Sequence, residues 1–354
     1  MAIGTREKSA RARSRRFYCA RSPVHSPAVG SDIDESSLLA SIGLRNWSVE
    51  RHLRSGGEPT WLVRPAGPAS ELLVVKKKRD YLSESEFLAH CAVHRRLADA
   101  GGPVPALPGE VPSNPVRGAD GALYEMWEWT PGRTPGLAAP DLRDLGAALA
   151  EFHLLAASAL DGVELQHQEP HDRFDKARFH LPLLAEGLAA RGADRHRALT
   201  AELADARQRA RTSEAPPDVV LHGDPCPGNV LLTRAGRAVL VDLDDVHRGP
   251  AVSDLAWSLI SVGAVVPEGD GFRESWDRPA FEAVLEGYQS RRPLSRTEHE
   301  VLPCWIVASL CCAATDQLYD YGWKISTEDL PAECDKVLAL AEPDNLPARS
   351  VHFG

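Results

Sequence analysis

Three residues whose side chains could take part in a reaction lie at the ends of short apolar runs in the second half of the chain: Asp224, Asn229 and Asp242. A carboxylate at such a position can orient an acceptor hydroxyl and take its proton. An amide oxygen and a second carboxylate can hold Mg²⁺ against nucleotide phosphates. One Asp in a loop is commonly a turn cap, but the joint spacing of the three indicates phosphoryl transfer.

The elements around these residues follow from the apolar pattern. Val219–Leu221 is predicted to be a strand that delivers Asp224 onto a loop rich in Pro and Gly. Val230–Leu232 and the run that ends at Val241 are predicted to form a hairpin, which places Asn229 and Asp242 at strand ends.

The first half of the chain predicts strands around one helix. Trp47–Pro65 reads as strand, Gly-rich turn and strand, and Leu72–Lys78 as a third strand. A helix is predicted to begin near Ser83 and to end before Gly101. After a linker over Trp129–Pro140, the chain is mainly of helical pattern, so we expect an α+β fold.

Composition narrows the function classes. The 354 residues have a formal net charge of −10, which argues against a general nucleic-acid binder and is compatible with a cationic or metal–nucleotide substrate. No apolar run is long enough for a transmembrane helix. The seven cysteines show no metal-binding pair spacing, so a reducing, cytoplasmic setting is expected.

The first 40 residues differ from the rest. They are rich in Arg and Ser and have no apolar core of a secretory signal. We expect a basic disordered tail over residues 1–40, with a docking arm for a partner as the alternative.

The segments "LHGDPCPGNVLL" and "AVLVDLDD" resemble the aminoglycoside phosphotransferase and choline kinase-like family, distant relatives of protein kinases. The resemblance implies a bilobal protein kinase-like fold, with a small β-rich N-lobe over 41–130 that binds nucleotide. A larger, mainly helical C-lobe over 131–345 would carry catalysis and the acceptor.

The same resemblance implies roles for the motif residues. Asp224 would be the catalytic base, and Asn229 and Asp242 would be metal ligands. His222 would order the loop, and Asp254, in "RGPAVSDLAWSL", would open a helix and brace the loop.

In the N-lobe, the resemblance assigns the phosphate-contacting turn to Ser55, Gly56 and Gly57. The phosphate-binding lysine should lie on the third strand. Side chains alternate along a strand, so Lys76 and Lys78 share one face, and Lys76 is favoured over Lys78.

A helix glutamate is expected to pair with that lysine, and here the chain departs from the family pattern. Counted back from "PVP", the expected position falls on His90, while Glu86 lies one turn earlier. Either Glu86 pairs with Lys76 or the ion pair is altered.

The segment "LYEMWEW" resembles the hinge that receives adenine. Backbone groups of Met126, Trp127 and Glu128 would make those hydrogen bonds, so ATP is expected and GTP is not excluded. His153 matches a family histidine and is interpreted as structural.

The sequence therefore predicts an ATP- and Mg²⁺-dependent O-phosphotransferase that acts on a hydroxyl of a small molecule, such as an aminoglycoside-like antibiotic or another natural product. One alternative is a kinase for Ser or Thr of a precursor peptide. The other is a catalytically degenerate nucleotide-binding scaffold. No nucleic-acid or membrane partner is expected.

Overall fold

The structure is a computed structural model of the whole chain. The residues that it describes are 34–54, 59–67, 71–80, 82–109, 114–160, 163–165, 173–174, 177, 193–216, 218–266, 271–315, 330–342 and 344–347.

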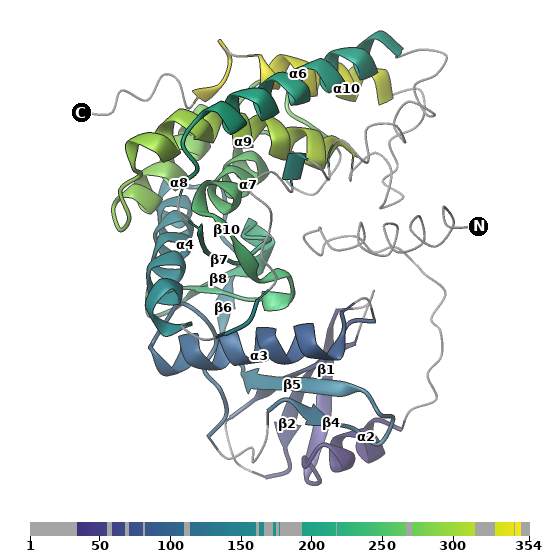
Figure 1. Cartoon of the computed structure of the whole chain (residues 1–354). Coiled ribbons are helices and arrows are strands. Elements are labelled where there is room, and N and C mark those ends of the chain that lie inside the picture. The colour runs from purple at the N-terminus through teal and green to yellow at the C-terminus, as the bar shows by residue number, and fades with distance from the viewer. Residues whose placement is uncertain are drawn as a thin grey trace.

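The N-terminal part is built on a five-stranded antiparallel sheet of order β1-β2-β3-β5-β4 (Figure 1). The strand–turn–strand pattern and the third strand were expected from short runs of apolar and β-branched residues, and the sheet contains these strands. The strands are β1 Trp47–Arg54, β2 Thr60–Pro65, β3 Leu73–Lys77, β4 Val116–Arg117 and β5 Leu123–Glu128.

One face of this sheet packs against a helix that the sequence interpretation assigned to the disordered tail. Helix α2, Glu35–Ser41, begins at Asp34, whose carboxylate accepts the backbone N–H groups of Ser36 and Ser37. Leu38 and Leu39 are buried against the sheet. The expectation of disorder is therefore wrong for residues 34–40, because burial of two leucines stabilises a helix that is too short to persist alone. The preceding part of the tail, residues 1–33, lies outside the described residues.

The other face of the sheet is covered by α3, Glu84–Asp99, which begins where the cap was expected. The Ser83 side chain accepts the backbone N–H of Glu86 and the Glu86 carboxylate accepts that of Ser83, which closes a capping box. Phe87 and Cys91 pack against Leu123 of β5. In Figure 1, α3 lies between the sheet and the small strands of the C-terminal part.

The C-terminal part is mainly helical, and one large apolar core joins its helices. Together with the N-terminal sheet, these helices confirm the predicted α+β class. In the described residues no helix is both long and apolar enough to span a membrane. The longer helices are α4 Ala139–Ala159, α6 Ala193–Thr212, α7 Ala251–Gly263, α8 Arg278–Gln289, α9 Arg296–Thr315 and α10 Leu330–Ala341.

Short strands beneath α4 and α7 carry the motif residues. β7, Asp218–Leu221, pairs with β10, His247–Pro250. β8, Val230–Thr233, pairs with β9, Ala238–Leu240, and with β6, Gly132–Arg133. The sheet of the N-terminal part ends at Glu128, so we keep the division into lobes over 41–130 and 131–345 as a proposal.

Candidate active site

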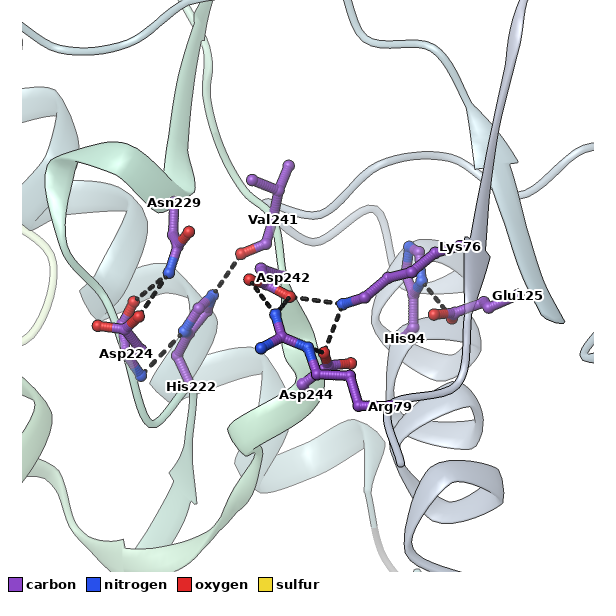
Figure 2. A network of polar contacts seen from close by, with 10 residues as sticks. All are labelled: Lys76, Arg79, His94, Glu125, His222, Asp224, Asn229, Val241, Asp242 and Asp244. Atoms are coloured by element: carbon purple, nitrogen blue, oxygen red, sulfur yellow. Dashed lines mark hydrogen bonds and ion pairs between the residues drawn. The ribbon is translucent and has the colours of Figure 1, made fainter. Parts of the chain in front are cut away.

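The loop between β7 and β8 carries Asp224 and Asn229 close together (Figure 2). A short 3-10 helix, η1 (Pro227–Asn229), turns the chain back toward Asp224. The Asn229 amide donates to the Asp224 carboxylate at 2.9 Å and to the Asp224 backbone carbonyl at 3.0 Å. Both residues are buried, so the amide holds the carboxylate in one orientation.

His222 ties this loop to the segment that carries Asp242. Its Nδ1 accepts the backbone N–H of Asp224 at 3.3 Å, and its Nε2 donates to the Val241 carbonyl at 3.0 Å. Both bonds suit a neutral ring with its proton on Nε2. One side chain thus fixes the backbone next to both acidic residues.

Asp254, in the first turn of α7, holds the backbone of the loop. Its carboxylate accepts the backbone N–H groups of His222, at 2.7 Å, and Gly223, at 3.1 Å. Gly223 has φ +90, and a Cβ there would lie 2.2 Å from the Asp245 carbonyl oxygen, so the tight turn requires glycine.

The brace continues into the helical core through His153. Its Nε2 lies 3.2 Å from the Asp254 carboxylate, and its Nδ1 lies 2.8 Å from the Tyr288 hydroxyl. Burial lowers the pKa of His153. Burial alone would raise the pKa of Asp254, but the hydrogen bond with His153 opposes that rise, and this pKa lies below its ordinary value. His153 therefore has the structural place expected of it.

Trp257 reaches the carboxylate of Asp224 from the same helix. The indole N–H donates to Asp224 Oδ1 at 2.7 Å, and the Arg173 guanidinium lies over the indole ring, 4.8 Å from its centroid. Arg173 also donates to the Gly223 carbonyl at 3.2 Å. Burial raises the pKa of Asp224, and the hydrogen bond from Trp257 and the charge of Arg173 oppose that rise.

Asp242 follows β9 in a left-handed conformation, φ 67 and ψ 63. It is the single non-glycine residue with positive φ among those that the structure describes. Such a conformation is unfavourable for a residue with a Cβ and persists where the surrounding fold imposes it. The turn it makes starts a second 3-10 helix, η2 (Leu243–Asp245), which presents Asp244 beside Asp242.

Two cations from the N-terminal part meet these two carboxylates. Lys76 Nζ lies 2.5 Å from Asp242 and 2.7 Å from Asp244. Arg79 contacts Asp242 at 3.0 Å and also pairs with Asp244. We call Lys76, Arg79, Asp242 and Asp244 the cross-lobe cluster (Figure 2).

The choice between the two lysines follows from their contacts. Lys76 reaches the acidic residues, whereas Lys78 donates to the backbone carbonyls of Arg79 and Leu82 at 2.9 and 2.7 Å. The expected pairing of Lys76 with Glu86 is not found among the described contacts. Because α3 begins at Glu84, Glu86 lies in the first turn, where its carboxylate caps the helix.

The hinge residues have protein partners of their own. Asn114 donates to the Met126 carbonyl and accepts the Met126 N–H, at 2.5 and 2.9 Å. The N–H of Glu128 donates to the Ala106 carbonyl at 2.9 Å. Adenine could therefore use these two N–H groups only by exchange, and the role of the backbone groups of Met126 and Glu128 at the hinge stays a prediction. Trp127 lies between them on β5, and its ring meets the His94 ring edge to face at 5.9 Å.

A family model described as "Phosphotransferase enzyme family" matches residues 50–294, more than half of the chain. The chain belongs to this family. The recognition made from the two motifs is thereby confirmed.

Curated relatives of this phosphotransferase-family chain include a homoserine kinase from Caulobacter sp. (strain K31). It is 31% identical over 210 residues, which are 58% of this chain and 60% of that protein. An uncharacterized protein from Deinococcus radiodurans is 29% identical over 216 residues, 55% of this chain and 58% of that protein. The chain thus covers less than two thirds of the length of either relative.

Solved structures show the fold. A microcompartment-associated aminopropanol kinase has a TM-score of 0.63 at 19% identity, over 84% of this chain and 92% of that one. A choline/ethanolamine kinase family protein from Mesorhizobium loti has a TM-score of 0.59 at 16% identity, over 90% of this chain and 97% of that one. An amicoumacin kinase in complex with AMP-PNP and Ca²⁺ has a TM-score of 0.59 at 15% identity, over 84% of this chain and 89% of that one. The bilobal kinase-like fold is confirmed.

The oxygen donors of the family chain fit a hard divalent cation. Among the described residues, no three His, Cys, Asp or Glu side chains gather into a preformed metal cage. Mg²⁺ is usually held by one or two carboxylates together with substrate phosphates and waters. Asn229 and Asp242 supply donors of that kind, and Lys76 and Arg79 here balance the charge of Asp242.

Some site residues were missed by the sequence interpretation, and some lie out of reach. Trp257 is three positions after Asp254 on one helix, so helical spacing could have found it. Arg79 and Asp244 stand in runs of similar charged residues, where spacing does not single them out. The turn residues Ser55, Gly56 and Gly57 lie outside the described residues.

Proposed function

We propose that the chain is an O-phosphotransferase that transfers phosphate from ATP to a hydroxyl of a small molecule, with a divalent cation, Mg²⁺, as cofactor. The observation that carries this is the meeting of Lys76 with Asp242 beside the Asp224–Asn229 loop, in a chain of the phosphotransferase family. The curated relative named as a homoserine kinase supports the same chemistry.

Each motif residue has a role in this proposal. Asp224 orients the acceptor hydroxyl and takes its proton as the oxygen attacks phosphorus. Asn229 and Asp242 hold the cation, which supplies neutralisation of phosphate charge when bound. Lys76 binds phosphate oxygens once it leaves Asp242. His222 and Asp254 keep the base in place through the backbone.

The acceptor proposed first is a small amino alcohol. The related proteins are named for homoserine and aminopropanol, and both names describe a hydroxyl near an amine. A formal net charge of −10 suits a cationic acceptor. The names of the relatives give no support to a precursor peptide, so that alternative enters only as an arm of the test. The cytoplasmic location remains part of the proposal, on the ground of the cysteine pattern.

The test measures phosphate transfer from Mg·ATP or Mg·GTP to homoserine, aminopropanol, choline, an aminoglycoside and a Ser/Thr peptide. Asp224→Asn keeps the shape of the base, and kcat should fall by about a thousandfold because proton acceptance is lost. Asp144→Asn, on the exposed face of α4, is the matched control and should leave kcat unchanged.

The other outcomes separate the alternatives. Transfer to the peptide alone would favour the peptide kinase. Nucleotide binding without transfer to any acceptor would favour the scaffold. Failure to bind any Mg·nucleotide would overturn the proposal.

A further inference from the structure

Lys76 has a carboxylate directly opposite it on the neighbouring strand. The register of β3 and β5 pairs Lys76 with Glu125, and directly opposed residues of an antiparallel pair point to the same face of the sheet. That face is the one covered by α3, because Leu123, two residues before Glu125, packs against Phe87 of the helix. Lys76 is 5% exposed and Glu125 is 8% exposed.

Glu125 is held in place by a histidine of α3. His94 Nδ1 lies 2.8 Å from the Glu125 carboxylate, and His94 Nε2 lies 2.9 Å from the Pro105 carbonyl oxygen. That carbonyl can only accept, so Nε2 carries a proton. The contact between His94 and Glu125 ties β5 to the helix. Figure 2 shows this pair on the far side of Lys76 from Asp224.

Lys76 and Glu125 are both among the groups that influence the buried thiol of Cys91. Burial raises the pKa of Cys91, and the charges of Glu125 and Asp244 and a hydrogen bond with Glu125 raise it further, while the charge of Lys76 lowers it. The groups that act on this one thiol thus include the lysine, the opposed glutamate and an acidic residue of the cross-lobe cluster.

A cation bound at Asp242 would change the negative charge that is left to compensate the Lys76 ammonium. The ammonium now lies between Asp242 and Asp244. A divalent ion held by Asp242 would repel the ammonium and would compensate the charge of that carboxylate. A buried ammonium is stable only with a compensating negative charge. Glu86 is engaged in the helix cap, whereas Glu125 faces the same side of the sheet as Lys76.

We propose that Glu125, held by His94, is the carboxylate partner of Lys76 in the nucleotide-bound protein. It takes the place in which the family pattern expects a glutamate of the helix. Glu125 is then a positioning residue: it orients the ammonium toward the phosphates without touching them. This inference rests on the proposed function, since it concerns the same nucleotide site.

The test is a double-mutant cycle on the affinity for Mg·AMP-PNP, measured by isothermal titration calorimetry on the full chain. Glu125→Gln keeps a hydrogen bond to His94 and removes only the charge. Affinity should fall about tenfold in the wild-type background. In the Lys76→Met background the same change should alter affinity by less than about twofold, because the partner is gone.

Two further variants make the result specific. Glu84→Gln, at the start of α3, removes the same charge from an exposed ion pair with Arg117 of β4 and should leave affinity unchanged. Glu125→Asp keeps the charge and should bind more tightly than Glu125→Gln. If Glu125→Gln does not melt cooperatively, His94→Gln replaces it in the cycle, with the same dependence on Lys76 expected.

Each other result overturns the inference in a distinguishable way. An equal loss in both backgrounds, or no loss in either, would show that Glu125 does not act through Lys76 and would leave the proposed function standing. A wild-type chain that binds no Mg·AMP-PNP would overturn this inference and the proposed function together.

Discussion

The catalytic loop and the cross-lobe cluster are held by different kinds of bond. In the loop, the backbone N–H groups of His222 and Gly223 bond to Asp254, and the Asp224 carboxylate is held by two donors. In the cross-lobe cluster, the ion pairs among the described residues join side chain to side chain, as where Lys76 meets Asp242. Backbone anchors leave a residue few alternatives, whereas paired side chains can exchange partners.

This difference suits the two tasks of a phosphotransferase. A base acts efficiently when it is fixed near its target. A phosphate-binding cation must instead leave its resting partner when the nucleotide arrives. The fixed region has deep support: from Asp254 the hydrogen bonds run through His153 and Tyr288 to Arg292, which pairs with Glu298 at 2.7 Å. The exchangeable cluster lies where the two parts of the molecule meet (Figure 2).

The largest effect is expected from breaking the brace. Asp254→Asn replaces one acceptor oxygen by an N–H donor, which would face a backbone donor of His222 or Gly223. Removing a charge from a buried, bonded pair leaves its partners unsatisfied, so the free energy of unfolding should fall by about 3 kcal/mol. Urea denaturation measures it.

Asp144→Asn on the exposed face of α4 is the matched control, with an expected change below about 0.5 kcal/mol. If Asp254→Asn changed the free energy of unfolding no more than Asp144→Asn does, the distinction between the two regions would be wrong.

A smaller effect separates the regions by kinetic parameter. Trp257→Phe removes one donor from Asp224 and keeps the ring under Arg173. The less restrained base should lower kcat about tenfold, while affinity for Mg·AMP-PNP stays unchanged. Glu125→Gln, by contrast, is expected to lower that affinity, so initial-rate kinetics and calorimetry on the two variants sharpen the comparison.

Trp276→Phe provides the control for the loss of an indole donor. Trp276 is buried and donates to the Leu340 carbonyl at 2.9 Å, in the helical core. The Trp276→Phe variant should have a lower free energy of unfolding than the wild type and an unchanged kcat. Equal losses of kcat in both tryptophan variants would mean that the bond from Trp257 has no special part in holding the base.

The sequence predicted the elements whose signals are local. Short runs of apolar and β-branched residues identified β2 and β3, and the Ser83 cap identified the start of α3. Helix α2 escaped because its stability comes from Leu38 and Leu39 packing on a sheet, which the local sequence does not reveal.

Site residues divide in the same manner. Asp224, Asn229 and Asp242 could be singled out because each stands at the end of a strand. The partner of Lys76 was sought along the helix, at Glu86, but strand register places a different carboxylate opposite the lysine. Register between strands distant in sequence depends on the whole sheet, so no spacing rule along one element finds it.

The smallest effect concerns pH. Burial lowers the pKa of His153 below its ordinary value of 6.5, so the folded chain prefers the neutral ring, which accepts from Tyr288 and donates to Asp254. Below about pH 6.5 the unfolded chain binds a proton that the folded chain does not, and stability falls as pH falls. The stability that the neutral His153 ring provides is fully present above that pH. Below it, the free energy of unfolding falls by up to about 1.4 kcal/mol per pH unit.

His153→Gln should flatten this dependence. Urea denaturation of both proteins between about pH 7.5 and about pH 5.5 measures the slope, in a window above the titration of most carboxyl groups. His52→Gln, at an exposed histidine of β1 that pairs with Glu35, is the surface comparison and should stay closer to the wild-type slope than His153→Gln does. If His153→Gln keeps it too, protonation of this ring does not limit the brace, and the acid sensitivity of the fixed region has another source.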